Sequence, residues 1–257
     1  MNAYERCVIM IKVLVNGSLG KMGTEVVNLV RNNPNLHLLG GLDSHISHNL
    51  FYPIYTDVND ILEKPDIIID FSIPSATIAL LPFCLKNSIP IVIATTGFTQ
   101  EQQNEINCAS LQIPIFQSSN LSYEVALMTK IVSELSTKLE NPEIEIVETH
   151  HSRKIDAPSG TALLLADSIN KANGNHYHYV FDRHEKSQKR SPKEIGFSSI
   201  RGGNIVGEHS VLFFNDYETI EIKHSAYSRS IFAQGAIKAA LFLVGQKAGL
   251  YSMEDLL

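Results

Sequence analysis

The chain has 257 residues, of which 44% are hydrophobic and 19% charged, and its formal net charge is −6 at pH 7. This length allows one large domain or two small ones, and the composition is that of an ordinary globular protein. The acidic balance argues against general binding to nucleic acids or acidic membranes, because both require a basic face.

The three cysteines and the N-terminal segment indicate the compartment. Cys7, Cys84 and Cys108 form no CxxC pair, so we expect reduced, largely buried thiols and no metal site. The apolar run at residues 8–15 is too short to cross a membrane, contains Lys12 and lacks a small-residue cleavage site. We therefore expect a soluble, cytoplasmic protein.

Strands and helices alternate through the first half of the chain. Apolar runs predict strands at residues 8–15, 36–43, 65–72, 89–98 and 113–120. Helical spacing predicts helices at residues 21–34, 75–88 and 99–112, the last capped by Thr99. This order predicts an α/β fold with a Rossmann-like, doubly wound parallel sheet.

The pattern changes after residue 121. A long amphipathic helix is predicted at 122–139, a half-buried strand at 143–151 and a helix after Pro158. Residues 173–194 are expected to be a mobile, solvated loop. Three strands follow at 195–203, 205–216 and 217–228, and then a helical segment at 232–257. We expect an α+β domain at 122–231 with a mixed, largely antiparallel sheet, and a dinucleotide-type domain at 1–121 to which 232–257 returns.

A glycine-rich loop lies between the first strand and the first helix. Gly17, Gly20 and Gly23 provide a tight turn, close backbone approach and helix amides for a pyrophosphate. Asp43, twenty residues after Gly23, can accept hydrogen bonds from the adenosine ribose. Ser44 follows it instead of an arginine, which predicts that NADH is used at least as well as NADPH. The alternatives are an ordinary loop and a solvated turn aspartate.

The third and fourth strands also end in polar segments. "DFSIPSAT" and "ATTGF" fall at the edge where ligands collect in such sheets. Ala94, Thr95, Thr96 and Gly97 offer small side chains and amides for a ribose or a nicotinamide. An ordinary strand-to-helix turn is the alternative.

The segment "ETHHSRKIDAPSGTAL" gathers cationic and titratable groups ahead of a helix. His150 and His151 end a strand, and Lys154 follows. Asp156 or Ser159 can cap the next helix, and Pro158 suits its first turn. Gly160 and Thr161 offer backbone amides and a hydroxyl to an anion. A structural histidine is the alternative, and the lysine argues against a metal site.

The same segment closely resembles the signature of the dihydrodipicolinate reductase family, also called 4-hydroxy-tetrahydrodipicolinate reductase. "NGSLGKMG", "ATTGF", "IRGGNIVGEHSVLFF" and "SRSIFAQGAIKAALFL" are similar to the family in the same order, so the resemblance covers nearly the whole chain. It implies NAD(P)H-dependent reduction of 4-hydroxy-tetrahydrodipicolinate, with loss of water, in diaminopimelate and lysine biosynthesis. It also implies a homotetramer built by the substrate-binding domain at 122–231, and a hinge that closes the two domains.

The resemblance assigns roles residue by residue. His150 matches the family's catalytic proton donor and acceptor, and Lys154 its second proton donor. His151, Gly160 and Thr161 match substrate-binding positions. The matching cofactor-binding positions are Gly17, Ser18, Leu19, Gly20, Lys21, Met22, Asp43, Ala94, Thr95, Thr96, Ser118, Ser119, Asn120 and Leu121.

Several positions depart from the family pattern. Ile73 and Ser44 stand where some members carry basic residues, which weakens the case for NADPH. Leu121 replaces an aromatic residue of some relatives, and Ala94 replaces a glycine. The alternatives are another nicotinamide-dependent imino- or oxo-acid reductase, which the His-His-x-x-Lys segment disfavours, and a dinucleotide-sensing regulator, for which no basic face is available.

Overall fold

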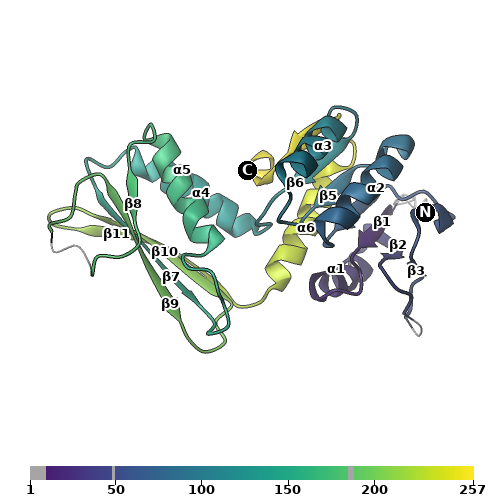
Figure 1. Cartoon of the computed structure of the whole chain (residues 1–257), viewed down its shortest axis with the longest axis horizontal. Helices are drawn as coiled ribbons and strands as arrows, with labels where there is room; N and C mark the ends of the chain where they lie inside the picture. The colour runs from purple at the N-terminus through teal and green to yellow at the C-terminus, as the bar shows by residue number, and fades with distance from the viewer. Residues whose placement is uncertain (1–9, 48–49, 185–187) are drawn as a thin grey trace, which may run out of the picture. The chain divides into compact units, whose positions relative to one another are not determined.

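The computed structural model describes residues 10–47, 50–184 and 188–257. The chain divides into two compact units: unit 1 runs to Ser122 and resumes at Ser230–Leu257, and unit 2 is Tyr123–Arg229. Figure 1 shows the elements of both units along the chain. Cys7 and the first two residues of the predicted 8–15 strand lie outside the described residues.

Unit 1 is built on sheet A, in which every pairing between described strands is parallel. In spatial order the strands are β12 (Gly249–Tyr251), β6 (Pro114–Gln117), β5 (Ile91–Ile93), β4 (Ile67–Asp70), β1 (Ile11–Asn16), β2 (Leu36–Leu42) and β3 (Ile54–Tyr55). The β1 and β4 strands are buried over almost their whole length, as the continuous apolar runs predict.

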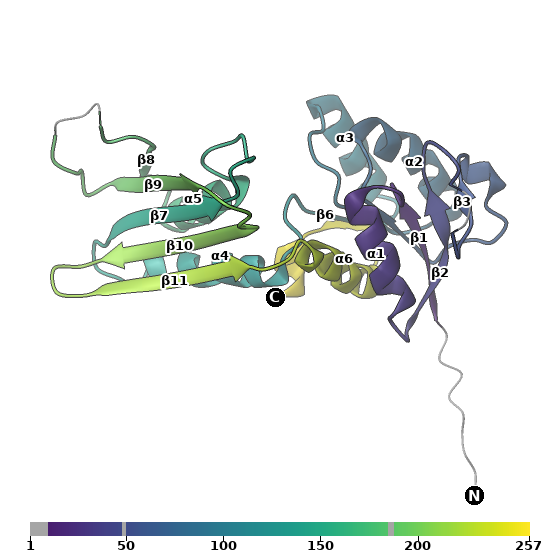
Figure 2. The ribbon, with the colours of Figure 1, turned by 90° about the horizontal axis from the view of Figure 1, so that it is seen from below.

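Helices cover both faces of sheet A (Figures 1 and 2). Helix α1 packs against α6, and α2 packs against α3. The bounds are α1 (Lys21–Arg31), α2 (Pro74–Asn87), α3 (Gln100–Ser110) and α6 (Ser230–Leu243), with short 3₁₀ helices η1 (Val58–Asp60) and η2 (Met253–Leu256). Thr99 caps α3 in a reciprocal capping box with Gln102, so that prediction is confirmed. The Rossmann-like, doubly wound sheet is also confirmed.

The strand order reverses at β1, which has β2 on one side and β4 on the other. In sheets of this kind ligands bind outside the carboxyl ends of the strands at such a switch point. The glycine loop directly follows β1 and therefore lies at that point. The core beneath it is formed by buried aliphatic side chains such as Leu14, Ile68 and Ile93.

Unit 2 contains sheet B, with two antiparallel and two parallel pairings, so the predicted mixed sheet is confirmed. In spatial order its strands are β11 (Thr219–Ala226), β10 (Gly207–Phe214), β7 (Glu143–His150), β9 (Glu194–Arg201) and β8 (His178–Val180). Helices α4 (Tyr123–Ser136) and α5 (Gly160–Ala172) pack together on one face of this sheet (Figure 2). Ile144, Ile146 and Val211 form part of the core between them.

Three expectations about secondary structure and burial are wrong. The predicted helix at 232–257 ends at Leu243, and the chain then adds β12 to the edge of sheet A beside β6. The predicted loop at 173–194 contains β8, which is stabilised by pairing with β9. Of the two described cysteines, Cys84 is buried but Cys108 is exposed.

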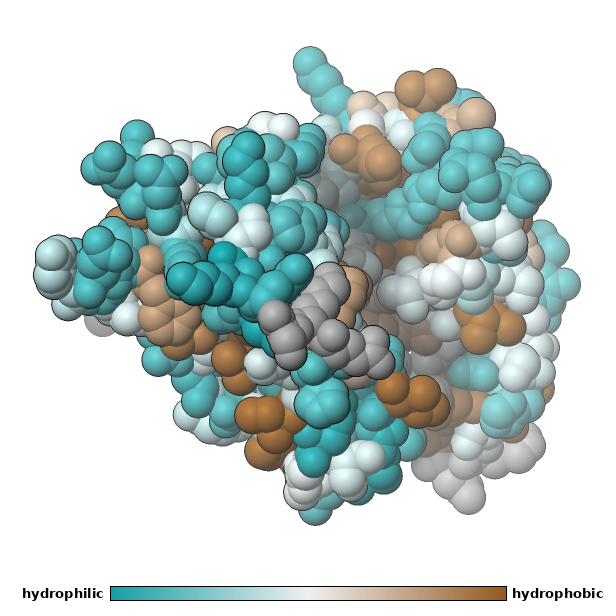
Figure 3. All heavy atoms as spheres, turned by 60° about the vertical axis from the view of Figure 1, so that its left-hand side comes forward, coloured by the Kyte–Doolittle hydropathy of each residue, from teal (hydrophilic) through white to brown (hydrophobic). Residues whose placement is uncertain are grey.

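Among the residues that the structure describes, no helix is long and apolar enough to cross a membrane. Figure 3 shows apolar side chains dispersed among polar ones on the face that it displays. Scattered exposure of this kind is ordinary for globular proteins.

Candidate functional site

In the glycine loop, the close approach of neighbouring backbone atoms explains why the first and third of these positions are occupied by glycine. Gly17 has a φ of +74°, and a Cβ atom there would lie 2.5 Å from the carbonyl oxygen of Phe71. A Cβ on Gly23 would lie 2.0 Å from the oxygen of Gly17. Gly20 is the N-cap of α1 and makes no side-chain cap hydrogen bond. The N-terminus of α1 is therefore approachable by an anion, since helix N-termini carry unpaired N–H groups.

Asp43 ties the end of β2 to this loop. Its Oδ2 accepts a hydrogen bond from the Leu19 amide at 2.9 Å, and its Oδ1 accepts one from the Ser44 amide at 2.8 Å. His45 Nδ1 lies 3.9 Å from Oδ1. The carboxylate thus remains an acceptor beside the loop, as ribose recognition requires.

A cavity of about 770 Å³ opens beside the loop and Asp43. Among the predicted cofactor residues, Gly17, Leu19, Gly20 and Asp43 line it. Ser18, Lys21 and Met22 do not. Ser18 is fully buried, and its side chain packs against Gly41 of β2. The other lining residues include Ser44, His45, Thr56, Asp57, Asn59, Phe71, Ser72 and Ile73.

A second cavity of about 330 Å³ lies at the ends of β5 and β6. Thr95, Thr96, Ser118 and Ser119 line it, together with Gly97, Phe98, Gln103 and Gln117. Ala94, Asn120 and Leu121 do not line it. Leu121 is only 3% exposed, and its carbonyl oxygen lies against Gly235 of α6.

Asp70 hydrogen-bonds to residues that line the two cavities, and the sequence did not single it out. Its fully buried carboxylate accepts from Asn16 Nδ2 at 2.8 Å, Thr77 Oγ1 at 2.6 Å and Thr95 Oγ1 at 3.0 Å. The amide and hydroxyl of Ser72 also donate to it. Burial raises the pKa of this carboxyl, while these hydrogen bonds oppose the rise. The ends of β1, β4 and β5 are therefore joined through one side chain.

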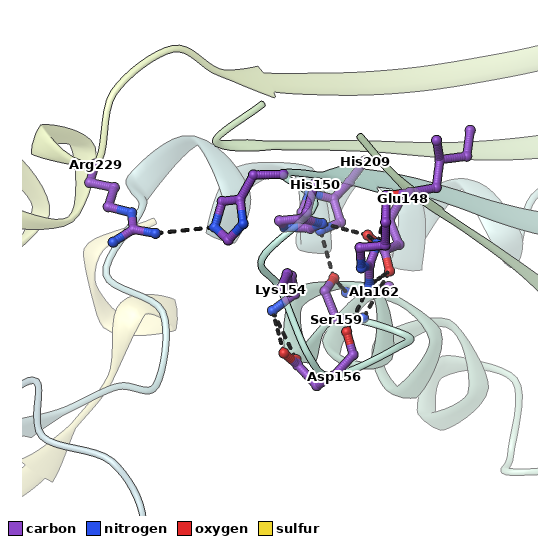
Figure 4. Close-up of polar contacts among 11 residues, drawn as sticks. Glu148, His150, Lys154, Asp156, Ser159, Ala162, His209 and Arg229 are labelled. Carbon is purple, nitrogen blue, oxygen red and sulfur yellow. Dashed lines mark hydrogen bonds and ion pairs between the residues drawn. The ribbon is translucent and has the colours of Figure 1, made fainter. Parts of the chain in front are cut away.

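In unit 2, the end of β7 presents an acid–imidazole pair (Figure 4). Glu148 and His150 point to the same face of the strand because they are two residues apart. Glu148 Oε2 lies 2.5 Å from His150 Nδ1, and both residues are buried. His151 follows the last residue of β7.

Arg201 holds this glutamate with two further hydrogen bonds. Nη1 donates to Oε2 at 2.8 Å and Nη2 to Oε1 at 2.6 Å. Burial opposes ionisation of Glu148, but hydrogen bonds from Arg201, Ser199 and His150 outweigh it and lower its pKa to about 2. The carboxyl is therefore ionised at neutral pH. Neither Glu148 nor Arg201 was identified from the sequence.

Lys154 lies close to this pair, in the loop that follows β7. Its Nζ donates to both carboxylate oxygens of Asp156 at 2.8 Å, and this lysine lowers the pKa of Asp156. Asp156 therefore pairs with the lysine and does not cap α5. Ser159 is the N-cap, since its Oγ accepts from the Ala162 amide at 3.2 Å. Pro158 precedes the cap, so its predicted place in the first turn is wrong.

The first helical residues of α5 are Gly160 and Thr161, as predicted, and Gly160 is exposed. Behind them, Ser159 Oγ lies 2.8 Å from Nε2 of His209, a buried residue of β10. Burial and then the charge of His150 lower the pKa of His209 to about 4. His209 is therefore neutral at neutral pH.

His151 contacts a second residue that the sequence did not identify. Its Nε2 lies 3.2 Å from Nη2 of Arg229, at the end of unit 2. Loss of hydration and the charges of Arg153 and Arg229 lower the pKa of His151. Cationic groups near the two histidines are thus Lys154, in the loop that follows them, and Arg229, which contacts His151.

A metal-binding cluster does not occur in the part of the chain that the structure describes: no group of three or more His, Cys, Asp or Glu side chains could hold an ion there.

Comparison with known proteins covers nearly the full chain. The family model described as "Dihydrodipicolinate reductase, N-terminus" matches residues 11–121, and the one described as "Dihydrodipicolinate reductase, C-terminus" matches residues 124–257. The 4-hydroxy-tetrahydrodipicolinate reductase of Caldanaerobacter subterraneus subsp. tengcongensis is 46% identical, covering 96% of this chain and 98% of that protein. The same-named protein of Clostridium tetani is 38% identical, covering 97% and 98%.

Solved structures agree. A dipicolinate-bound dihydrodipicolinate reductase from Paenisporosarcina sp. TG-14 superposes with a TM-score of 0.81 at 28% identity, covering 96% of this chain and 100% of that one. An amine dehydrogenase from Mycobacterium smegmatis shares only the fold, with a TM-score of 0.62 at 9% identity. The two family models and these relatives together show that the chain belongs to the dihydrodipicolinate reductase family.

Proposed function

We propose that this protein is an NAD(P)H-dependent oxidoreductase that reduces 4-hydroxy-tetrahydrodipicolinate to tetrahydrodipicolinate, with loss of water, in diaminopimelate and lysine biosynthesis. The observation that carries the proposal is the Glu148–His150 pair next to Lys154 and the start of α5, in a chain of this family. Two relatives that are 46% and 38% identical carry the name of this activity. The substrate is a small dicarboxylate.

Positive groups in unit 2 suit such a substrate. One carboxylate is held by the Gly160 amide and the Thr161 hydroxyl at the positive end of the α5 dipole. His151 and Arg229 provide donors for the ring or the second carboxylate. Lys154 exchanges its contact with Asp156 for substrate, because that partner is 61% exposed and easily rehydrated. We propose unit 2 as the substrate-binding domain.

His150 is the proton donor in this proposal. When hydride reaches the conjugated ring, negative charge develops toward the ring nitrogen, and a nearby acid stabilises it. An imidazole titrates near neutral pH and can supply that proton, an effect worth about two to four powers of ten in rate. Lys154 is the second proton donor.

Unit 1 is the proposed dinucleotide-binding domain. The close approaches at Gly17 and Gly23 leave the α1 N-terminus accessible, which suits a pyrophosphate. Asp43 holds the adenosine ribose, and Thr95, Thr96, Ser118 and Ser119 line a smaller cavity for the nicotinamide half. Bound here, a reduced nicotinamide dinucleotide supplies the hydride. Ala94, Asn120 and Leu121 act by shaping the backbone, and Ser18, Lys21 and Met22 by forming the loop.

We propose that NADH is used at least as well as NADPH. A 2′-phosphate would lie near the Asp43 carboxylate, and among the described cavity residues there is no lysine or arginine to neutralise it. The kcat/KM values with the two cofactors should therefore be equal or favour NADH. A large preference for NADPH would contradict this assignment.

Assembly and compartment are proposed as a homotetramer in the cytoplasm. Ile200 and Ile220 of sheet B are 51% and 39% exposed, so this sheet has apolar surface available for self-association. The exposed free thiol of Cys108 suits a reducing compartment. Light scattering of the purified protein tests the tetramer.

The activity itself is tested by following loss of the absorbance of reduced nicotinamide. The purified protein is supplied with NADH or NADPH and freshly generated 4-hydroxy-tetrahydrodipicolinate, and with a panel of other imino and oxo acids as controls. We expect turnover with the first substrate to exceed that with every other acid. Equal or better turnover of another acid would overturn the proposal.

A further inference from the structure

We propose that Glu148 and Arg201 form a positioning pair that holds His150 in its Nδ1–H form and fixes it to the first turn of α5. One buried carboxylate would then set both the orientation of the proton donor and the location of the substrate carboxylate site. This inference rests on the proposed function, because it assigns residues that act through His150. Neither residue is itself placed in contact with substrate.

The geometry at His150 determines which nitrogen carries the proton. Glu148 is ionised, and an ionised carboxylate can only accept hydrogen bonds, so Nδ1 of His150 must donate across the 2.5 Å contact. Nδ1 therefore carries a proton both when the ring is neutral and when it is charged. The proton that the ring gives up is consequently the one on Nε2.

The surroundings of Nε2 keep that nitrogen available. Within the described residues no hydrogen bond to it is found, and the neighbouring residue on β10 is Gly207. A Cβ atom on Gly207 would lie only 3.0 Å from Nε2. The absence of a side chain at that position therefore leaves room beside the reacting nitrogen.

Arg201 fixes the carboxylate from the adjacent strand. It is the register partner of His150 in the parallel pairing of β7 with β9. Besides its two bonds to Glu148, its Nη2 donates to the carbonyl oxygen of Asp156 at 2.7 Å. The guanidinium thus joins β7, β9 and the loop that carries Lys154. Bidentate pairing of this kind restricts orientation more than a single contact does.

Glu148 also reaches α5. Its Oε1 accepts a hydrogen bond from the Ser159 amide at 3.2 Å. Ser159 caps α5 and contacts His209, whose ring lies 5.1 Å from that of His150 in an edge-to-face arrangement. Ser159 Oγ and His209 Nε2 share a hydrogen bond, and a neutral His209 does not compete for the glutamate. The proton donor and the helix start are therefore tied to the same carboxylate.

The titratable and charged side chains near His150 come from several elements: Glu148 and His151 on or beside β7, Lys154 in the following loop, Arg201 on β9 and His209 on β10. Of these only Glu148 is negative, so Glu148→Gln removes the one carboxylate of this group.

The central experiment replaces Glu148 by Gln and Arg201 by Lys. Glu148→Gln keeps the shape but offers an N–H to Nδ1, which favours the opposite ring tautomer. We expect kcat to fall by about 100-fold, the general-acid contribution, and the alkaline limb of the kcat–pH profile to move to lower pH. Dipicolinate affinity should weaken several-fold, because the start of α5 loses an anchor. Arg201→Lys should give a smaller change of the same kind.

Matched controls come from the same sheet. Glu145 on β7 accepts hydrogen bonds from Arg183 and Arg190, so it is another carboxylate–guanidinium cluster away from His150. Glu145→Gln and Arg190→Lys should leave kcat and its pH profile unchanged. Circular dichroism and thermal melting compare the folding of all four variants. If Glu148→Gln does not fold, Arg201→Lys is used for every measurement.

Nitrogen NMR of the histidine rings separates this inference from the proposed function. His150, assigned by its loss in His150→Gln, should show a protonated Nδ1 in the wild type and an altered tautomer in Glu148→Gln. This measurement requires no turnover, so it stands even if the wild type fails to reduce the substrate. A folded variant with an unchanged ring signal, or with a wild-type kcat and pH profile, would overturn the positioning role.

Discussion

The glycine loop of unit 1 and the acid–imidazole pair of unit 2, the two proposed binding sites, are built in different ways. The loop relies on backbone geometry, since Gly17 and Gly23 bring main-chain atoms within 3 Å of positions that a side chain would fill. The pair relies on side chains from separate strands, with Glu148, His150 and Arg201 held by short hydrogen bonds. Binding a constant cofactor group can depend on shape, whereas proton transfer depends on titratable groups with fixed partners.

The largest effect is expected at His150, the proposed proton donor. His150→Gln removes the titratable ring, so we expect turnover to fall by at least ~100-fold while dipicolinate and dinucleotide binding stay within a few-fold of wild type. Steady-state kinetics and equilibrium titration measure the two quantities. His178→Gln, at an exposed position of β8, serves as the control and should be active. Near-normal turnover of His150→Gln would refute its assignment.

Substitution of Lys154 should lower activity nearly as much as substitution of His150, for two reasons. Lys154→Ala removes the proposed second proton donor and a proposed cation for the dicarboxylate, so kcat should fall by at least ~100-fold and the substrate KM should rise. Lys223→Ala is the matched control, because Lys223 also pairs with one carboxylate, that of Glu208, on sheet B. Wild-type kcat in Lys154→Ala would show that the lysine has no part in the chemistry.

In the glycine loop, adding a single methyl group to a glycine should weaken dinucleotide binding. Gly23→Ala places a Cβ 2.0 Å from the Gly17 oxygen, whereas Gly20→Ala places one at 3.2 Å. Overpacking of this kind costs about 1–3 kcal/mol, which corresponds to about 10- to 100-fold in cofactor affinity. We expect Gly23→Ala to lose dinucleotide binding to this extent and to keep dipicolinate binding. Equal effects of the two substitutions would contradict the steric argument.

The smallest expected effect is on stability, at His209. Its pKa is about 4 in the fold against 6.5 ordinarily, so the unfolded chain binds this proton first as pH falls. Stability from this group is complete above pH 6.5 and is lost as pH falls toward 4, by about 1 kcal/mol at pH 5.5. Denaturant unfolding of wild type and His209→Gln should diverge in slope only within this window. A parallel pH dependence would rule out a buried, neutral His209.

The sequence was sufficient to predict those features of the structure that depend on residues close together in the chain. The apolar runs gave the buried strands, Thr99 with Gln102 gave the start of α3, and the spacing of Gly17, Gly20 and Gly23 gave the loop, because each depends on neighbouring residues. The position of His150 at a strand end also followed from alternation.

Long-range partners could not be predicted in this way. Arg201 is 53 residues from Glu148, and only the pairing of β7 with β9 brings it to His150. Ser159 meets His209 across 50 residues because β10, which carries His209, pairs with β7. Strand β12 has three residues and no alternation of its own, so only its pairing with β6 identifies it. Pairing between distant strands is not encoded in any short window of sequence.

The route of the chain through unit 1 affects how the protein is made. Unit 1 is left at Ser122 and completed only by Ser230–Leu257, which supplies α6 and the edge strand β12. At this junction Gly235 of α6 packs so closely on Leu121 that a Cβ would lie 1.6 Å from its carbonyl oxygen. During synthesis, all of unit 2 leaves the ribosome before α6 and β12 are made. Sheet A of unit 1 is therefore incomplete until the last residues of the chain have been added. If synthesis stops before residue 230, the released chain has the strands β1 to β6 of sheet A but lacks helix α6 and the edge strand β12.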